Sequence, residues 1–237
     1  MNQNVKKSYQ KLTSHYVRDV DTKPYNAYLE RPAMVEAMPP LKDKQVLDAG
    51  CAAGWYSQYM AEEGAVVTAV DFSPSMVEAT RRRTETLNVT TFVHDISTQF
   101  PLASESLDVI VSSLTLHYIK DWEAVFKEFA RLLKPGGTLL FSTHHPFMDY
   151  DRFDVENYYD VQLLKDQWTV NGERVPMEFY RRPLNQIINL TMDQFNLSRI
   201  IEPLPTEEFK HLSPQSYEKV RTTPNFIILK AEKPEAR

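Results

Sequence analysis

The stretch that decides the fold is Val46-Leu47-Asp48-Ala49-Gly50-Cys51-Ala52-Ala53-Gly54. Its apolar first half is typical of a buried strand, and its second half holds Gly50 and Gly54, two of only six glycines in the chain. Glycine permits a sharp turn and lets a ligand approach the backbone closely. A helix over 55–63, ended by Gly64, is predicted directly after the turn. A strand, a glycine turn and a helix start together predict a nucleotide-binding corner.

The segments around this corner alternate between strand and helix. Helical patterns are predicted at 74–87, 122–133 and 184–195, and strands at 45–48, 66–70, 91–93, 107–112, 138–142, 198–202 and 225–231. This alternation indicates right-handed βαβ units and a parallel sheet with helices on both faces. Ligands of such sheets bind at the carboxyl ends of the strands, so the residues at those ends are the candidate site.

Three parts of the chain differ in pattern. Residues 1–38 are predicted to be helical with proline breaks, and residues 39–146 with 184–237 carry the strand and helix alternation. Residues 147–183 are aromatic and polar, and Asn171-Gly172 predicts a β-hairpin within them. This segment is too long for a tight connection, so we expect an insertion that packs over the sheet.

Composition excludes several classes of protein. The chain has 237 residues, of which 42% are hydrophobic and 25% charged, an ordinary globular balance. Cys51 is the single cysteine, so no intrachain disulfide is possible, and a reducing, cytoplasmic compartment is expected. The start of the chain is polar and unlike a secretory signal, and no apolar run approaches the roughly 20 residues of a membrane span. The net charge of -5 disfavours a nucleic-acid partner.

The ligand of the corner is predicted from its acidic residues. Asp71 follows Gly50 by about 20 residues, at the end of the next strand, where a carboxylate accepts hydrogen bonds from ribose hydroxyls. A dinucleotide motif requires G-x-G-x-x-G, but Ala52 and Trp55 occupy the second and third glycine positions. We expect Asp48 to face the ligand, where it would repel a pyrophosphate and attract a cation. The order of residues therefore favours S-adenosylmethionine, which carries an ammonium and a sulfonium.

The same residues resemble the class I S-adenosylmethionine-dependent methyltransferases. The motifs that carry the resemblance are 46–54, Val70-Asp71-Phe72-Ser73-Pro74-Ser75-Met76, Asp95-Ile96, 107–118 and 132–137. They cover residues 25–145 well and the final strands more loosely. The resemblance implies an α/β, Rossmann-like sheet of seven strands whose last strand is antiparallel. It also implies methyl transfer to an acceptor, which leaves S-adenosylhomocysteine as product. A small-molecule acceptor is expected because the aromatic segment 147–183 can form a cap over it.

The resemblance also assigns residues to the cofactor. Asp71 would bind the ribose, Asp95 the adenine amino group, and Leu114 would lie near the sulfonium. Residues 1–38 would form an N-terminal helical lid over the cofactor. Where the family usually has a glycine, this chain has Ala52. Carried over in full, the cofactor-binding residues are Tyr16, Arg31, Asp48, Gly50, Cys51, Ala52, Gly54, Asp71, Phe72, Met76, Asp95, Ile96 and Leu114.

Histidines at strand ends are the candidates for a catalytic base. A base is needed only if the acceptor must lose a proton, and His117 and His145 are predicted to serve. The pair His144-His145 does not predict a metal site, because neighbouring residues on a strand face opposite sides and no third ligand is present. Cys51 is expected to be a small buried residue and not a nucleophile.

Other functions remain open at this point. A tRNA or protein methyltransferase is the first alternative, although the acidic balance and the lack of an Asn-Pro-Pro-aromatic motif count against it. A second alternative is a non-catalytic S-adenosylmethionine-binding protein, and an NAD-dependent dehydrogenase is the third. The sequence leaves open whether the chain is a monomer or a homodimer.

Overall fold

The structure is a computed structural model that describes residues 21–170 and 173–235. Tyr16, the beginning of the expected N-terminal lid and the Asn171-Gly172 turn lie outside the described residues.

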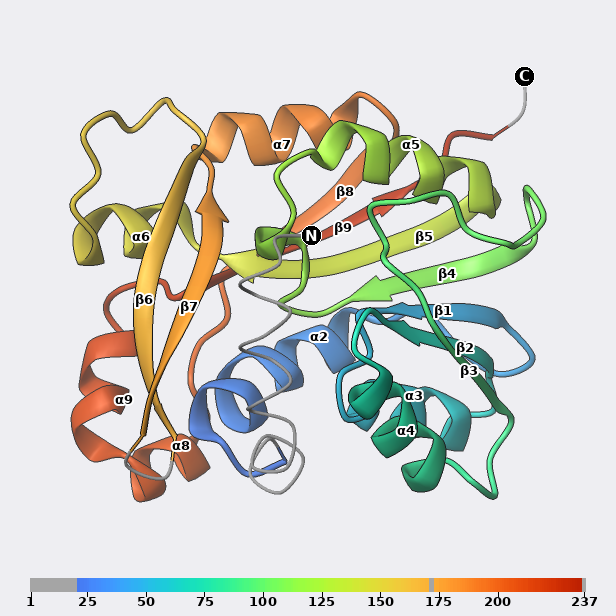
Figure 1. Cartoon of the computed structure of the whole chain (residues 1–237), viewed down its shortest axis with the longest axis horizontal. Coiled ribbons are helices and arrows are strands. Elements are labelled where there is room, and N and C mark those ends of the chain that lie inside the picture. The colour runs from blue at the N-terminus through green and yellow to red at the C-terminus, as the bar shows by residue number, and fades with distance from the viewer. Residues whose placement is uncertain (1–20, 171–172, 236–237) are drawn as a thin grey trace.

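A seven-stranded sheet crosses the middle of the molecule (Figure 1), in the order β3-β2-β1-β4-β5-β9-β8. Strands β1 to β5 pair in parallel, and β9 is antiparallel to both of its neighbours, β5 and β8. The predicted fold class, with its antiparallel last strand, is confirmed. The strands are β1 Gln45–Ala49, β2 Val66–Asp71, β3 Val89–Val93, β4 Leu107–Ser112, β5 Leu133–His144, β8 Asn196–Ile201 and β9 Phe226–Glu232.

Helices cover both faces of this sheet (Figure 1). One face carries α2 Arg31–Ala37 and α3 Trp55–Glu62, with α4 Pro74–Arg83 beside α3. The opposite face carries α5 Trp122–Leu132 and α7 Leu184–Met192. Two short helical segments lie near the ends of strands: the π-helix η1 Asn26–Glu30 and the 3-10 helix η2 Leu116–Tyr118.

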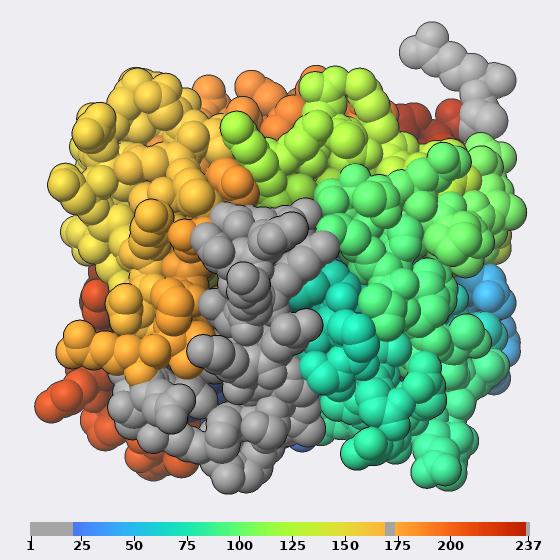
Figure 2. All heavy atoms as spheres, viewed as in Figure 1, coloured from blue at the N-terminus to red at the C-terminus, as the bar shows by residue number. Residues whose placement is uncertain are grey.

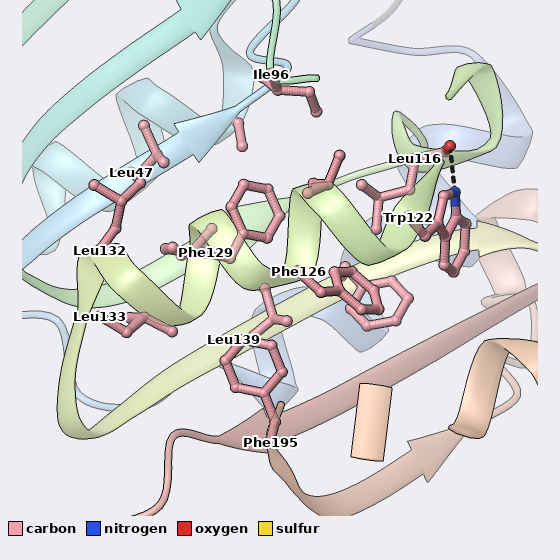
Figure 3. Packing of buried hydrophobic residues seen from close by; sticks show 14 of the residues in the cluster. Leu47, Ile96, Leu116, Trp122, Phe126, Phe129, Leu132, Leu133, Leu139 and Phe195 are labelled. Atoms are coloured by element: carbon pink, nitrogen blue, oxygen red, sulfur yellow. Dashed lines mark hydrogen bonds between the residues drawn. The ribbon is translucent and has the colours of Figure 1, made fainter. Parts of the chain in front are cut away.

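Alternate residues of the central strands supply two apolar layers. In β5, Leu139 and Phe141 face α5, whereas Leu140 faces the layer that contains α2 and α3. The layer under α5 is aromatic: Figure 3 shows Trp122, Phe126 and Phe129 on one side of that helix. The Asp121 carboxylate caps α5 by accepting a hydrogen bond from the Ala124 amide at 3.2 Å. The predicted amphipathic helix is confirmed, but it ends at Leu132 and the extended chain begins at once.

The inserted segment forms a small unit of its own at one end of the sheet. It contains α6 Pro146–Arg152 and a two-stranded hairpin of β6 Gln162–Val170 and β7 Glu173–Arg181. The predicted hairpin is confirmed, with longer strands than expected. Figure 2 shows this segment, in yellow and orange, gathered at one end of the visible face. Two helices that the sequence did not predict, α8 Glu207–Leu212 and α9 Pro214–Val220, lie between β8 and β9 in the chain.

The buried indole of Trp122 gives a test of the core. Its Nε1 donates to the carbonyl of Leu116 at 2.8 Å (Figure 3). Trp122→Phe removes this bond and leaves the carbonyl only the Ile119 amide, at 2.9 Å, so we expect the free energy of unfolding in urea to fall by about 1 kcal/mol. Trp168→Phe is the control, because its Nε1 donates to Asp166 in a half-exposed position. An equal decrease in the free energy of unfolding in Trp122→Phe and Trp168→Phe would contradict this account.

Candidate functional site

The glycine turn after β1 adopts left-handed backbone conformations. Gly50 has φ +95° and Gly54 has φ +79°, and Ala52 between them has φ +46°. A Cβ on Gly50 would lie 2.3 Å from Thr115 Oγ1, so a side chain does not fit there. Ala52 stands where the family has glycine and keeps a backbone conformation that favours glycine. The turn therefore retains its shape despite the substitution.

Asp71 at the end of β2 is fixed by backbone amides. The Ala52 amide donates to Oδ2 at 3.1 Å and the Ser73 amide donates to Oδ1 at 2.9 Å. Burial raises the pKa of Asp71 to about 6, although these two hydrogen bonds oppose the shift. The carboxylate is thus joined to the glycine turn and lines the cavity above it.

Asp48 differs from the expectation that it faces the ligand. Its side chain does not line the cavity: the Ser57 hydroxyl donates to Oδ2 at 2.5 Å, which directs the carboxylate toward α3. Burial raises the pKa of Asp48 to about 7, and the nearby charge of Asp71 adds to the shift. Side chains along β1 alternate between the two faces of the sheet, and the chain turns away only at Gly50. The Asp48 side chain therefore stays on the face that α3 covers.

A first cavity lies above the glycine turn. Its volume is about 790 Å³ when the open solvent at its mouth is included. The expected cofactor residues that line it are Arg31, Gly50, Cys51, Ala52, Asp71, Phe72, Ile96 and Leu114. The structure therefore brings together residues from the lid, the turn and the ends of four strands.

Four expected residues lie outside this lining. Besides Asp48, Gly54 is the N-cap of α3, and Met76 is fully buried in the interior. Asp95 accepts hydrogen bonds from the Ser97 amide at 3.1 Å and the Ser97 hydroxyl at 2.6 Å. Burial alone would raise the pKa of Asp95, but the Ser97 hydrogen bonds contribute to a net lowering. The neighbours of Asp95 in the chain, His94 and Ile96, line the cavity instead.

Glu30, which the sequence did not single out, is a buried carboxylate in the cavity wall. It lies 1% exposed at the end of the π-helix η1. Three hydroxyls donate to it: Tyr56 Oη at 2.8 Å, Ser113 Oγ at 2.8 Å and Ser142 Oγ at 2.6 Å. Burial raises its pKa, and the three hydroxyls and Arg31 oppose the shift. π-Helical turns occur frequently at functional sites.

The next residue, Arg31, places the opposite charge in the same cavity. Its guanidinium lies 4.0 Å from the centre of the Trp55 ring, and Nη1 donates to the backbone carbonyl of Asp21 at 3.1 Å. Glu30 and Arg31 thus bring a carboxyl group and a guanidinium to one cavity. This pair matches a ligand that carries both a cationic group and a carboxylate, as the methionine part of S-adenosylmethionine does.

A second, larger cavity adjoins the first. Its volume is about 1440 Å³ counted out to open solvent, and it shares Asn26, Leu114 and Tyr118 with the first cavity. His117 lines it, together with His144, and the two imidazole rings stack with centroids 4.0 Å apart. Burial holds the pKa of His117 well below its usual value, and the charges of His144 and Arg182 lower it further. His117 is therefore neutral near pH 7.

His145, the other predicted base, lies in neither cavity lining. Its Nδ1 accepts a hydrogen bond from the Phe147 amide at 3.2 Å, so the proton is on Nε2, which donates to Glu202 at 2.9 Å. Burial lowers the pKa of His145, against the opposing charge of Glu202. Nδ1 thus caps the start of α6, and Nε2 contacts Glu202, the residue after β8. The structure thus places His144, and not His145, beside His117.

The Cys51 thiol is buried beside the glycine turn. Burial raises the pKa of this thiol well above its usual value, and the charges of Asp48 and Asp71 add to the effect. A thiolate is therefore disfavoured here, as the expectation of an unreactive cysteine requires.

Several lining residues were missed by sequence reasoning. Trp55 and Tyr56 directly follow the glycine turn, and Ser113 and Thr115 flank Leu114, so their positions next to motif residues were an available signal. Glu30 directly precedes the expected Arg31, but its partner Ser142 is far away in the chain, so the sequence did not indicate its hydrogen bonds.

Comparisons with known proteins agree with this geometry. A family model described as a methyltransferase domain matches residues 47–141. The chain is 35% identical over 145 residues to a malonyl-[acyl-carrier protein] O-methyltransferase of Serratia marcescens, covering 61% of this chain and 50% of that protein. It is 36% identical over 111 residues to a ubiquinone biosynthesis O-methyltransferase of Coxiella burnetii, covering 46% and 47%. The chain therefore matches only about half the length of these curated relatives.

A solved structure extends the likeness over most of the chain. The crystal structure of a proposed S-adenosylmethionine-dependent methyltransferase of Listeria monocytogenes matches with a TM-score of 0.77 and 26% identity. The match covers 87% of this chain and 97% of that one. Residues 47–141 thus match the methyltransferase domain family, and the chain has the fold of an S-adenosylmethionine-dependent methyltransferase. Its cofactor is accordingly S-adenosylmethionine, and the first cavity of this methyltransferase offers a glycine turn, two carboxylates and a guanidinium to receive it.

The described part of the chain contains neither a membrane-spanning helix nor a metal-binding cluster. Within residues 21–170 and 173–235, no helix is long and apolar enough to cross a membrane. In the same residues, histidine, cysteine, aspartate and glutamate side chains form no group of three that could hold a metal ion.

Glu30 provides a test of the electrostatics of the first cavity. Glu30→Gln keeps the size of the side chain but removes its negative charge, so we expect affinity for S-adenosylmethionine to fall about tenfold. S-adenosylhomocysteine lacks the sulfonium charge, so its affinity should fall less. Calorimetric titration of both ligands measures the two changes. Glu36→Gln, on the exposed side of α2, is the control and should change neither affinity. If Glu30→Gln leaves the ratio of the affinities for S-adenosylmethionine and S-adenosylhomocysteine unchanged, the charge assignment is wrong.

Proposed function

We propose that this methyltransferase transfers the methyl group of S-adenosylmethionine to a small-molecule acceptor held in the second cavity. The observation that carries the proposal is the wall that both cavities share, formed by Asn26, Leu114 and Tyr118. A cofactor in the first cavity and an acceptor in the second would meet at this wall. Methyl transfer requires such a meeting, because the acceptor atom must approach the methyl carbon in line with the bond that breaks.

The position of the cofactor follows from the groups at the two ends of the first cavity. Asp71 and Phe72 would hold the ribose and adenine, and Arg31 would bind the carboxylate of the methionine part. Glu30 lies among the residues near Leu114, where a cationic centre would gain from its charge. The sulfonium would then lie at the shared wall, and the cofactor supplies an activated methyl group there.

His117 and His144 are the groups of the second cavity suited to accept a proton. His144 Nδ1 lies 3.5 Å from Oδ1 of Asp149, a carboxylate only 2% exposed. The two atoms form no hydrogen bond in this structure. A proton on Nδ1 would face the carboxylate and leave Nε2 to contact the acceptor. When the acceptor group is a hydroxyl, the imidazole would take its proton, and the bound cofactor would supply the activated methyl group to the oxygen. His144 would then be the base, and Asp149 a positioning residue.

Both curated relatives are named as O-methyltransferases, which supports an oxygen atom as the acceptor. The named substrates of those proteins differ, so they do not define a single acceptor for this chain. The inserted α6 and the β6–β7 hairpin supply part of the second cavity, including Met148, Trp168 and Phe179. An enclosing aromatic wall supports a small molecule more than a folded RNA or protein.

Asp71 gives the first test of cofactor binding. Asp71→Asn removes the charge that accepts ribose hydrogen bonds, so we expect affinity for S-adenosylhomocysteine to fall about tenfold or more in calorimetry. The ionised carboxylate is the binding form, and its pKa is about 6. Affinity should therefore be full at pH 7.5 and about tenfold weaker at pH 5, and Asp71→Asn should flatten this dependence. Asp48 and Glu30 also have raised pKa values, so the difference between the two proteins isolates Asp71.

The control for that test is Asp108→Asn. Asp108 also accepts a backbone hydrogen bond, from the Gln45 amide at 2.8 Å, but lies outside both cavities. Wild-type protein that fails to bind S-adenosylhomocysteine at any pH would overturn the proposed function. Binding without methyl transfer across a panel of small acceptors would instead support a non-catalytic binding protein.

The adjacent histidines give the test of catalysis once an acceptor has been found in that panel. His144→Gln should lower kcat about 100-fold or more for a hydroxyl acceptor, with unchanged affinity for the cofactor. Asp149→Asn should lower kcat less and change the dependence of the rate on pH. His145→Gln is the matched control, because this neighbouring imidazole contacts Glu202 and the Phe147 amide instead of a cavity. A larger loss in His145→Gln than in His144→Gln would refute the assignment.

A further inference from the structure

Three consecutive arginines, Arg81, Arg82 and Arg83, end α4 but differ in their surroundings. Arg81 and Arg82 are mostly exposed, and both pair with Glu78 on the same helix, at 2.7 and 3.0 Å. The Arg83 side chain is only 20% exposed and makes other contacts. Arg83 lies three residues after Thr80, and both side chains reach the glycine turn from one face of α4. Arg83 is therefore the arginine that faces inward.

Arg83 joins the glycine turn to the described part of the lid. Its Nη1 donates to the Ala53 carbonyl at 3.1 Å, and its Nη2 donates to Oδ2 of Asp21. An ion pair with a largely covered guanidinium is screened less by salt than a pair on an open helix face. Arg83 thus connects residue 21 to the turn that follows β1.

Asp21 in turn contacts Arg31, the guanidinium of the first cavity. Arg31 Nη1 donates to the Asp21 backbone carbonyl at 3.1 Å, and the guanidinium lies 4.0 Å from the centre of the Trp55 ring. Arg31 lines the cavity, whereas Arg83 and Asp21 do not. The contacts therefore run from Arg83 through Asp21 to a residue that can touch a ligand.

The orientation of Arg31 matters because of the shape of its side chain. A guanidinium binds a carboxylate best when its planar fork faces both carboxylate oxygens. Contacts that fix the fork before a ligand arrives reduce the conformational freedom that binding must remove.

We propose that Arg83 is a positioning residue for cofactor binding, which acts through Asp21 to orient Arg31 toward the carboxylate of the methionine part. This inference rests on the proposed function, because it takes the position of the cofactor from it. Arg83 itself touches no part of the cofactor in this arrangement.

The test compares two ligands that differ in the amino-acid part. 5′-Methylthioadenosine has the adenosine and sulfur of S-adenosylhomocysteine but a methyl group in place of the amino-acid chain. Both are titrated by calorimetry at pH 7.5. In Arg83→Gln we expect affinity for S-adenosylhomocysteine to fall about tenfold and affinity for 5′-methylthioadenosine to change less than about twofold. Asp21→Asn removes the charge that Arg83 binds, so it should also weaken S-adenosylhomocysteine alone.

Arg82→Gln is the matched control. It makes the same substitution at the neighbouring residue, whose side chain is 78% exposed and pairs with Glu78. Neither affinity should change in this variant. Wild-type affinity for 5′-methylthioadenosine in Arg83→Gln would also show that this variant is folded.

A double variant tests the route through Arg31. Arg31→Gln removes the guanidinium, so the addition of Arg83→Gln should weaken S-adenosylhomocysteine less than about twofold further. A full additional loss would mean that Arg83 acts independently of Arg31, and the inference would be wrong.

The remaining outcomes separate this inference from the proposed function. Failure of the wild-type protein to bind S-adenosylhomocysteine would overturn the proposed function itself. Normal wild-type binding, with the same affinity in Arg83→Gln and Asp21→Asn, would overturn only the positioning role. Equal losses for both ligands would also overturn it, because a general structural role of Arg83 would weaken both ligands alike.

Discussion

The buried carboxylate of Glu30 is the interaction on which the arrangement of the two cavities depends. A carboxylate without solvent is strongly disfavoured unless several hydrogen bonds reach it. Here the hydroxyls come from α3, from the residue after β4 and from β5, so three separate elements must converge on the end of η1. The described part of the lid is therefore fixed against the sheet (Figure 1). The residues that the two cavities share lie at this place.

The same network holds the residue that separates the cavities. The Leu114 amide donates to Ser142 Oγ at 2.9 Å, and that hydroxyl in turn donates to Glu30. Leu114 has φ +45°, a conformation that costs about 1 kcal/mol or more for a residue with a side chain. Such a conformation persists only when its surroundings determine it, and the two apolar layers of the sheet supply that rigidity. A strained, well-held residue between two ligands suits a reaction that depends on alignment.

The sequence was sufficient to predict those features whose contacts join residues close together in the chain. The glycine turn, Asp71 and the alternation of strand and helix depend on residues close together in the chain, and the structure contains them. The choice between His144 and His145 depends on which face of β5 meets the lid. Leu140, Ser142 and His144 share one face of β5, and Ser142 contacts Glu30 on that face. Because this contact joins residues far apart in the sequence, the face toward the site could not be read from β5 alone.

The shared wall also implies that the two ligands influence each other. Leu114 and Tyr118 line both cavities, so a ligand that shifts either side chain on one side alters the surface offered on the other. Any such effect must be reciprocal, because the free energy of coupling is the same whichever ligand binds first. Glu30 lies behind this wall with a raised pKa, and a cationic cofactor would stabilise its ionised form. The charge of the cofactor would then strengthen the hydrogen bonds that fix the wall.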